Sequence, residues 1–510
     1  MESKKDFEAP FEKAIAKIEA IIRAYAPASI VLNCIDFLES RTPTAITEIK
    51  KHPWLILLLM KWTLTDRLVT MQGRPNIPRP EFIRAVNIII KQSGSGRLPS
   101  LYDHPVLFMR ALSFQQFPYQ HDGGYIDLAR QQELFAHADV NHFYHTEFMK
   151  LTGVSISDFI LLSYITMGVI VQPGPFERAV FFEVCGDFPP AVVDSFLRAI
   201  SIDLDALPEA LAPFADTPKR PSSYLSVTPL LQLSPIIKIQ SSYFSVHPVI
   251  TGRYLGHFIY DKLKATSATK FQHRFGKTFE EYIGKLIKLT GLQFKTERQL
   301  KSSLPGEGKV VDFLIEELSA RIFIDAKGVE LAKKGMFTHD KDIAKSAVET
   351  SLLSAYEQGQ ATAARVLLSS PPTKHGQQIE NYLIAVTYKE LYIGNGESLA
   401  LAIGDKALDS KDAYIYEKFG IKSPIPRDHI YFLTINEFEI LARLVEDNKI
   451  TFSAALERAK QADSVPLNKK FVFDLHIYSW QKEFSIVHPL KEKSLVIVDS
   501  MMSRIDSALK

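Results

Sequence analysis

Three carboxylates and a lysine stand at spacings that could support metal-assisted chemistry. Asp325 and Lys327 close an apolar run at residues 322–324, Asp312 lies in the apolar segment before it, and Glu280 lies farther upstream. Burying three carboxylates together costs free energy unless a cation offsets their charge. Mg²⁺ prefers such hard oxygen ligands and accepts phosphate oxygens beside them, and a nearby lysine can hold an attacking water. These residues therefore favour a Mg²⁺ site at which water attacks a phosphate group.

A pair of strands must bring the two aspartates and the lysine together. The apolar segments 310–315 and 321–327 are separated by a short polar turn, which predicts a β-hairpin. Because side chains on a strand alternate between its faces, Asp325 and Lys327 share one face of the second strand. We expect Asp312, on the first strand, to lie close to both.

The fourth residue lies on a predicted helix that precedes the hairpin. The segment from 271 to 292, FQHRFGKTFEEYIGKLIKLTGL, has apolar residues at helical spacing. Glu280 lies beside Ile283 and Ile287 and borders the apolar face, whereas Glu281 lies on the outside. Of the two acids, Glu280 is the one expected to reach an interior site.

The order of these elements resembles that of the PD-(D/E)xK, or restriction-endonuclease-like, nuclease superfamily. A helix with Glu, a strand with Asp, a strand ending in Asp-x-Lys and a further helix follow one another over roughly residues 271–390. Two positions depart from the pattern. Val311 stands where the name of the motif has proline, and Asp325 stands where glutamate is the more usual residue.

The resemblance implies a nuclease that hydrolyses phosphodiester bonds and leaves a 5′-phosphate. It implies that Glu280, Asp312 and Asp325 surround Mg²⁺, for which Mn²⁺ can substitute, and that Lys327 assists the nucleophile. Gln358, on the helix after the hairpin, is a further candidate because related nucleases often place a glutamine there. DNA is favoured over RNA by the habit of the family. An RNA nuclease, and a non-enzymatic scaffold that binds nucleic acid or protein, are the alternatives.

The Asp-x-Lys pattern alone has little value, and the chain contains two internal controls. Asp-x-Lys also occurs at residues 409–411 and 447–449. Neither copy closes an apolar strand, so both are expected to be solvated positions. For the copy at 325–327, the alternative interpretation is an ordinary hairpin with surface acids.

Positive charge is concentrated just before the hairpin. The whole chain has a net charge of only +2, but residues 253–309 contain twelve Lys or Arg against five Asp or Glu. Such a cluster could follow a phosphate backbone, although a solvated helical face is the ordinary alternative. The candidate nucleic-acid contacts are Lys277, Lys285, Lys288, Lys295, Arg298 and Lys301.

The change along the chain from helical periodicity to alternating strand and helix patterns predicts an α+β protein of several domains. We expect a mostly helical domain at 1–207, a proline-rich boundary at 208–222, the α/β nuclease-like domain with a mixed sheet at 223–465, and a C-terminal segment at 466–510. The segment FVFDLHIYSW, which begins at residue 471, is rich in strand-forming residues and is expected to be a strand.

Other features indicate a cytoplasmic protein outside the membrane. The chain has two cysteines, and its N-terminus lacks the apolar core of a signal peptide. The apolar runs 54–60 and 159–171 are shorter than the ~20 residues of a membrane span and are expected to be buried helices. His142 and His145 have a spacing that a metal site could use, but ordinary helix-start histidines are the expected interpretation.

A nuclease with a large helical extension is similar in organisation to bacterial anti-phage defence effectors. By that analogy, we expect residues 1–207 to recognise a partner or trigger and to restrain the nuclease until it binds.

Overall fold

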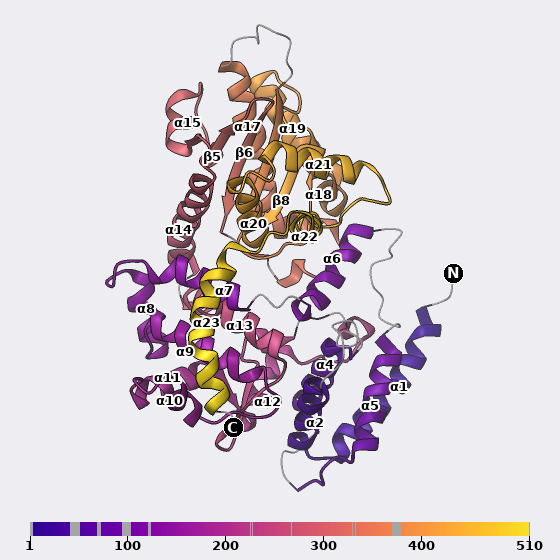
Figure 1. Ribbon diagram of the computed structural model, residues 1–510. Helices are drawn as coiled ribbons and strands as arrows, with labels where there is room; N and C mark the ends of the chain where they lie inside the picture. Colours follow the sequence, from indigo (N-terminus) through magenta and orange to yellow (C-terminus); the bar gives the residue numbers. More distant parts are fainter. Residues whose placement is uncertain are drawn as a thin grey trace. The chain divides into compact units, whose positions relative to one another are not determined.

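The chain forms two units that alternate along the sequence (Figure 1). Unit 1 comprises residues 1–98, 112–266 and 490–510, and unit 2 comprises 99–111 and 267–489. This computed structural model describes residues 4–40, 51–68, 73–93, 104–120, 124–224, 226, 228–266, 268–328, 330–331, 333–369 and 379–508. Helices predominate, and each unit contains one mixed sheet, so the predicted α+β class is confirmed.

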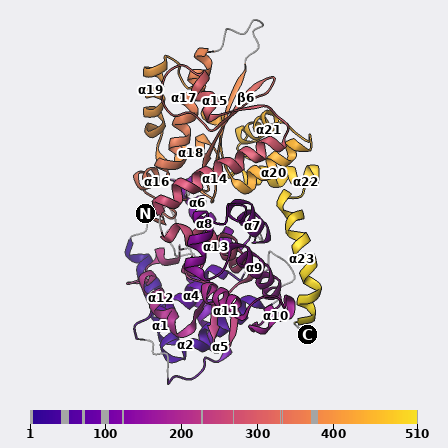
Figure 2. The same cartoon turned by 90° about the vertical axis from the view of Figure 1, so that its left-hand side faces the viewer.

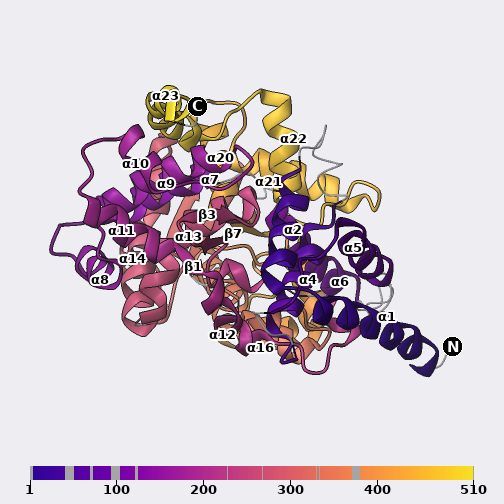
Figure 3. The ribbon, with the colours of Figure 1, turned by 90° about the horizontal axis from the view of Figure 1, so that it is seen from below.

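Unit 1 is mostly helical, as predicted for the N-terminal part of the chain. The first helices pack around an apolar face that includes Phe11, Ile15, Ile18 and Ile22, all buried. Figure 3 shows α2, α4 and α5 gathered together. The helices of unit 1 are α1 (Lys4–Ala24), α2 (Pro27–Glu39), α4 (Pro53–Thr65), α5 (Arg79–Ser93), α7 (Gly124–Gln131), α8 (Phe143–Thr152), α9 (Ile156–Ile170), α10 (Ala179–Val184), α11 (Pro190–Ile200), α12 (Leu207–Leu211), α13 (Pro248–Thr266) and most of α23 (Pro489–Ala508).

The two apolar runs form helices that are buried on nearly all sides. These are α4 and α9, as expected for core helices. Among the described residues, no single helix has both the length and the apolar composition needed to cross a membrane. Two strongly bent helix pairs, α1 with α2 and α8 with α9, meet those two criteria only when each pair is counted together.

The predicted boundary at 208–222 is wrong, because the chain on both sides of it belongs to one sheet. Strand β1 (Ser201–Asp203) pairs in parallel with β2 (Ile236–Ile239), which pairs antiparallel with β3 (Ser242–Ser245). The first strand precedes the prolines and the other two follow them. The hairpin β2–β3 therefore completes unit 1, although the prediction assigned it to the nuclease-like domain.

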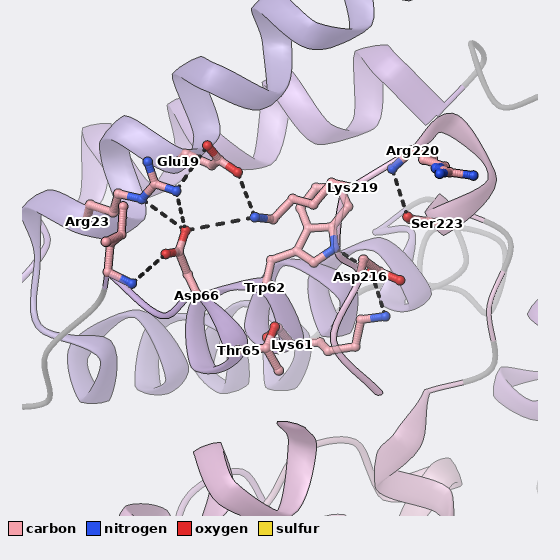
Figure 4. Close-up of polar contacts among 11 residues, drawn as sticks. Glu19, Arg23, Lys61, Trp62, Thr65, Asp66, Asp216, Lys219, Arg220 and Ser223 are labelled. Carbon is pink, nitrogen blue, oxygen red and sulfur yellow. Dashed lines mark hydrogen bonds and ion pairs between the residues drawn. The ribbon is translucent and has the colours of Figure 1, made fainter. Parts of the chain in front are cut away.

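Polar contacts also fix the proline-rich segment to the helices of unit 1 (Figure 4). Asp216 accepts a hydrogen bond from Trp62 Nε1 at 2.7 Å and lies 2.7 Å from Lys61 Nζ. Lys219 Nζ donates to Glu19 Oε1 at 2.7 Å and lies 3.8 Å from Asp66. A segment with two such anchors is an integral part of the fold and cannot act as a free linker.

Removing the carboxylate of Asp216 should destabilise unit 1. Lys61 is almost fully buried, so Asp216→Ala would leave its charge without this partner, at a cost of about 2–3 kcal/mol in the free energy of unfolding. Urea denaturation followed by circular dichroism measures the change. Asp203→Ala is the matched control, because its pair with Lys238 is exposed and should contribute less than about 1 kcal/mol. Equal losses in the two variants would contradict this role for Asp216.

Unit 2 is built on a five-stranded mixed sheet with the order β4–β5–β6–β7–β8. The strands are β4 (Phe294–Thr296), β5 (Phe313–Glu316), β6 (Ala320–Lys327), β7 (Glu380–Thr387) and β8 (Ile430–Thr434). Antiparallel pairing joins β4, β5 and β6, and parallel pairing joins β6, β7 and β8. The predicted hairpin and mixed sheet are thus present.

Helices cover both faces of this sheet. Phe313 lies against Gly284 of α14, whereas Leu383, which points to the opposite face, lies against Gly359 of α17. Figure 2 shows α17 and α19 on one side of the sheet and α20 and α21 on the other. The helices are α14 (Ala268–Leu289), α15 (Glu297–Ser303), α16 (Lys341–Val348), α17 (Ser354–Ser369), α18 (Gly396–Ile403), α19 (Asp405–Phe419), α20 (Ile435–Glu446), α21 (Phe452–Ser464) and α22 (Asp474–Phe484).

The C-terminal segment also differs from the prediction. The segment expected to be a strand forms α22, because Phe473, Ile477 and Trp480 recur at helical spacing and are all buried. Helix α22 belongs to unit 2, whereas residues 490–510 belong to unit 1. Helix α6 (Pro105–Gln116) also contributes its first part to unit 2 and its second part to unit 1. Residues 466–510, for which the sequence left open a place in the second domain or a separate unit, are thus divided between units 2 and 1 at residue 490.

Candidate active site

Asp312 and Asp325 lie opposite each other at the end of the β5–β6 ladder. The ladder pairs Phe313 with Ile324, and continuing this register by one residue places Asp312 against Asp325. The backbone N–H of Ala326 donates to Asp312 Oδ2 at 2.6 Å. Strand β5 begins at Phe313, so the predicted start at residue 310 is too early, but the expected juxtaposition of the two carboxylates is present.

Lys327 connects this pair of strands to helix α17. Its Nζ lies 2.7 Å from Asp325 Oδ2 and donates to Gln358 Oε1 at 2.6 Å. Helix α17 is itself tied to the residues just before β5, because Thr362 Oγ1 accepts from the N–H of Val311 at 3.0 Å. The structure therefore brings together four of the predicted site residues, including Gln358, the weakest of the candidates.

Burial makes the negative charge of this cluster costly. Asp325 is only 1% exposed, and burial raises its pKa above the usual value, while the charge of Lys327 opposes the shift. Burial and the charge of Asp325 raise the pKa of Asp312 to about 8. A cation between these carboxylates would favour their ionised forms, since an opposite charge stabilises a carboxylate.

Glu280 lies near the two aspartates but does not join them in a ligand cluster. Asp325 points to the face covered by α17, whereas α14, which carries Glu280, covers the other face. Gly328, just after β6, lies against Phe275 and Gly276 of α14, one helical turn before Glu280. Burial and the charge of Glu297 raise the pKa of Glu280, and Asp325 contributes to the shift.

The predicted set of three metal ligands is not assembled in the structure. Among the residues described, no group of three or more His, Cys, Asp or Glu side chains is placed to hold a metal ion. Helix α14, which carries Glu280, packs on the face of the sheet opposite to the one that Asp325 occupies, and Glu280 acts on the two aspartates through its charge. Asp312 and Asp325 remain as the two carboxylates that share a face.

Two charged residues near this site are not among the predicted site residues. Glu297 comes directly after β4. The register pairs Thr296 of β4 with Phe313 of β5, so continuing it by one residue places Glu297 opposite Asp312. The charge of Glu297 raises the pKa of Asp325. The charge of Lys309 lowers the pKa of Asp325, so Lys309 also lies near this carboxylate. Only the pairing of β4 with β5 reveals Glu297, whereas Lys309 was visible as part of the basic cluster.

The predicted nucleic-acid contacts all lie on the surface of unit 2. Lys277, Lys285, Lys288, Lys295, Arg298 and Lys301 are exposed. Ion pairs join three of them to nearby acids, namely Lys277 to Glu281, Lys295 to Glu316 and Lys301 to Glu297. These pairs fit the ordinary alternative of a solvated helical face for part of the set, and nucleic-acid binding stays a prediction.

The internal controls behave as expected. Asp409 lies on helix α19 and pairs with Arg427, and Asp447 follows helix α20 and pairs with Arg443. Neither copy of Asp-x-Lys therefore closes a strand. His142 begins helix α8, with its ring accepting from the N–H of Tyr144, and His145 contacts the carbonyl oxygen of Ala138, so both are ordinary helix-start histidines.

Comparison with known proteins finds no matching family model, no matching curated protein and no matching solved structure.

Proposed function

We propose that this chain is a metal-dependent nuclease that hydrolyses phosphodiester bonds, with DNA favoured over RNA as the substrate. The observation that carries the proposal is the arrangement of Asp325, Lys327, Asp312 and Gln358 at the end of one strand pair. Buried carboxylates with raised pKa values and a lysine partner, gathered at one site, are typical of functional sites.

The donor set fits a hard divalent cation such as Mg²⁺ or Mn²⁺. Mg²⁺ is commonly held by one or two carboxylates, with waters and substrate phosphate oxygens completing its coordination. Asp312 and Asp325 would hold it, and Glu280 lies near enough to influence both carboxylates electrostatically. When bound, the ion would supply Lewis acidity and lower the pKa of a coordinated water.

The protein side chains then have separate roles in the proposed hydrolysis. Water forms a new P–O bond, the P–O3′ bond breaks, and the products carry a 5′-phosphate and a 3′-hydroxyl. Lys327, held between Asp325 and Gln358, would orient the water and offset charge on the phosphate. Gln358 would act as a positioning residue because it contacts Lys327.

The proposal is tested with the purified full chain on plasmid DNA, single-stranded DNA and total RNA. Each substrate is incubated with Mg²⁺ and, separately, with EDTA. Mg²⁺-dependent cleavage of DNA with 5′-phosphate products would support the proposal. Cleavage of RNA alone would favour the RNA nuclease, and binding without cleavage would favour the non-enzymatic scaffold.

Gln358→Ala should slow cleavage by about 10–100-fold, because Lys327 would lose the acceptor that fixes its Nζ. Gln358→Glu keeps an acceptor at that position and should retain more activity than Gln358→Ala. Initial rates at saturating Mg²⁺ measure both variants. If Gln358→Glu and Gln358→Ala lose the same activity, Gln358 does not act by holding Lys327.

Restraint of the nuclease by the N-terminal part, as in a defence effector, stays a prediction. A fragment beginning near Ser222 is not a suitable probe of it, because β1 and every helix of unit 1 before α13 would be removed. Residues 99–111 also belong to unit 2, where Arg110 donates to the carbonyl oxygen of Leu391. Any such test therefore requires the full chain.

A further inference from the structure

A cavity of about 450 Å³ lies in unit 2 beside the proposed site. Gln358 lines it and also accepts the hydrogen bond from Lys327, so the cavity and the reacting groups share a side chain. Helices α17 and α19, which pack against each other, form much of its wall. This volume falls in the range of sites that bind small molecules, roughly 300–1,000 Å³.

Three cations gather around residues 304–309, a segment whose last three residues line the cavity. Arg365 is buried, and its guanidinium donates to the carbonyl oxygens of Leu304, Pro305 and Gly306. No carboxylate among the described residues pairs with it, and its Nη1 has no hydrogen-bond partner there. Among the described residues, the partners of the Arg365 guanidinium are thus backbone carbonyl oxygens, and its Nη1 is left able to attract an anion.

The other two cations adjoin the same segment. Lys309 is the last residue of this segment and is exposed. The Nζ atom of Lys418 lies about 4.0 Å from the position that a Cβ atom would occupy on Gly308. Carboxylates also line the cavity, and one of them, Glu357, pairs with Lys411. Because positive and negative groups nearly balance, charge alone would bind a polyanion weakly.

Aromatic rings supply the second element of recognition. Tyr414 and Phe419 line the cavity, and the side chain of Tyr414 is 47% exposed. Lys418 Nζ lies 5.7 Å from the ring centre of Tyr414 and 5.4 Å from that of Phe419. Exposed aromatic rings beside cations are the means by which proteins bind unpaired nucleotides, with the base stacked and the phosphate near the positive charge.

We propose that this cavity binds one unpaired nucleotide of the strand that the adjacent site cleaves, with its base on Tyr414 and its phosphate at Lys309, Lys418 and Arg365. The inference rests on the proposed nuclease function and names its substrate class as single-stranded DNA. In a duplex, the faces of each base are covered by its neighbours, so a base can reach such a ring only when it is unstacked.

The test measures binding of the full chain to a fluorescent 12-nucleotide DNA strand in EDTA, where no metal-dependent cleavage occurs. Tyr414→Ala should weaken binding of the single strand about tenfold and leave binding of the matching duplex unchanged. Tyr416→Ala is the matched control, because Tyr416 lies on the same helix, is 57% exposed and does not line the cavity. Lys309→Gln should reduce the slope of log affinity against log salt by about one.

The outcomes separate this inference from the proposed function. Equal single-strand binding by wild type, Tyr414→Ala and Tyr416→Ala would overturn the inference. Displacement of the strand by free dAMP at equal affinity would overturn it too, since the ligand would then be a free nucleotide. Mg²⁺-dependent cleavage that is insensitive to Tyr414→Ala would leave the nuclease in place without this pocket. Tyr414-dependent binding with no cleavage would instead contradict the proposed nuclease function and support nucleotide binding in the cavity.

Discussion

Asp325→Asn and Lys327→Met are expected to lower the rate of DNA cleavage by at least about 10²–10³-fold, because each removes a charge that would act directly on the reacting phosphate or its metal ion. Both replacements keep the approximate volume of the side chain. The buried end of β6 should therefore remain packed, and circular dichroism spectra should match that of the wild type. Initial rates in Mg²⁺ on plasmid and single-stranded DNA provide the measurement.

The chain offers a matched control for each of these variants. Asp409→Asn changes the aspartate of another Asp-x-Lys copy, which lies on a helix and pairs with Arg427 on the surface. Lys449→Met changes an exposed lysine of the third copy. Neither should alter the rate. Wild-type activity in folded Asp325→Asn would mean that the site is elsewhere, and strong loss in Asp409→Asn would mean that the wrong copy was chosen.

Asp312→Asn is expected to stabilise the metal-free protein at pH 8 while removing its stabilisation by Mg²⁺. The raised pKa of Asp312, about 8, means that ionising it in the folded state is unfavourable. The asparagine has no charge, and its amide oxygen can still accept from the N–H of Ala326. We expect a gain on the order of 3 kcal/mol, or roughly 5–10 °C in the melting temperature of unit 2.

The dependence on pH follows from proton linkage. Below about pH 4, Asp312 is protonated in both the folded and the unfolded chain, so the replacement changes little. Between pH 4 and 8, the unfolded carboxyl loses its proton before the folded one, and the stability of the wild type falls as the pH rises. The advantage of Asp312→Asn should therefore grow from pH 5 to pH 8.

Thermal unfolding in EDTA and in Mg²⁺ at pH 5 and pH 8 tests this linkage. Glu316→Gln is the control, because Glu316 is exposed and lies at the other end of β5, away from the carboxylate pair. An advantage of Asp312→Asn that is the same at both pH values would contradict the assignment of a raised pKa to Asp312. A gain in melting temperature with Mg²⁺ that persists in Asp312→Asn would show that this carboxylate does not hold the ion.

The sequence by itself determined the local elements that carry the chemistry. Apolar residues with a period of two predicted the hairpin, and helical spacing predicted the helix that carries Glu280 with its side chain bordering the buried face. The structure confirms that Glu280 is half-buried and Glu281 exposed. Such patterns are readable because each element must turn its apolar residues toward a core, whatever the partner.

Only the tertiary structure decided which of these residues meet. The pairing of β4 with β5 brings Glu297 to the site, and the packing of α17 brings Gln358 to Lys327. Helix α14, which carries Glu280, covers the other face of the sheet. The prolines at 208–221 indicated a boundary, yet Asp216 and Lys219 anchor that segment within unit 1. These outcomes depend on contacts between residues far apart in the chain, and local periodicity contains no information about strand register or about which helix covers which face.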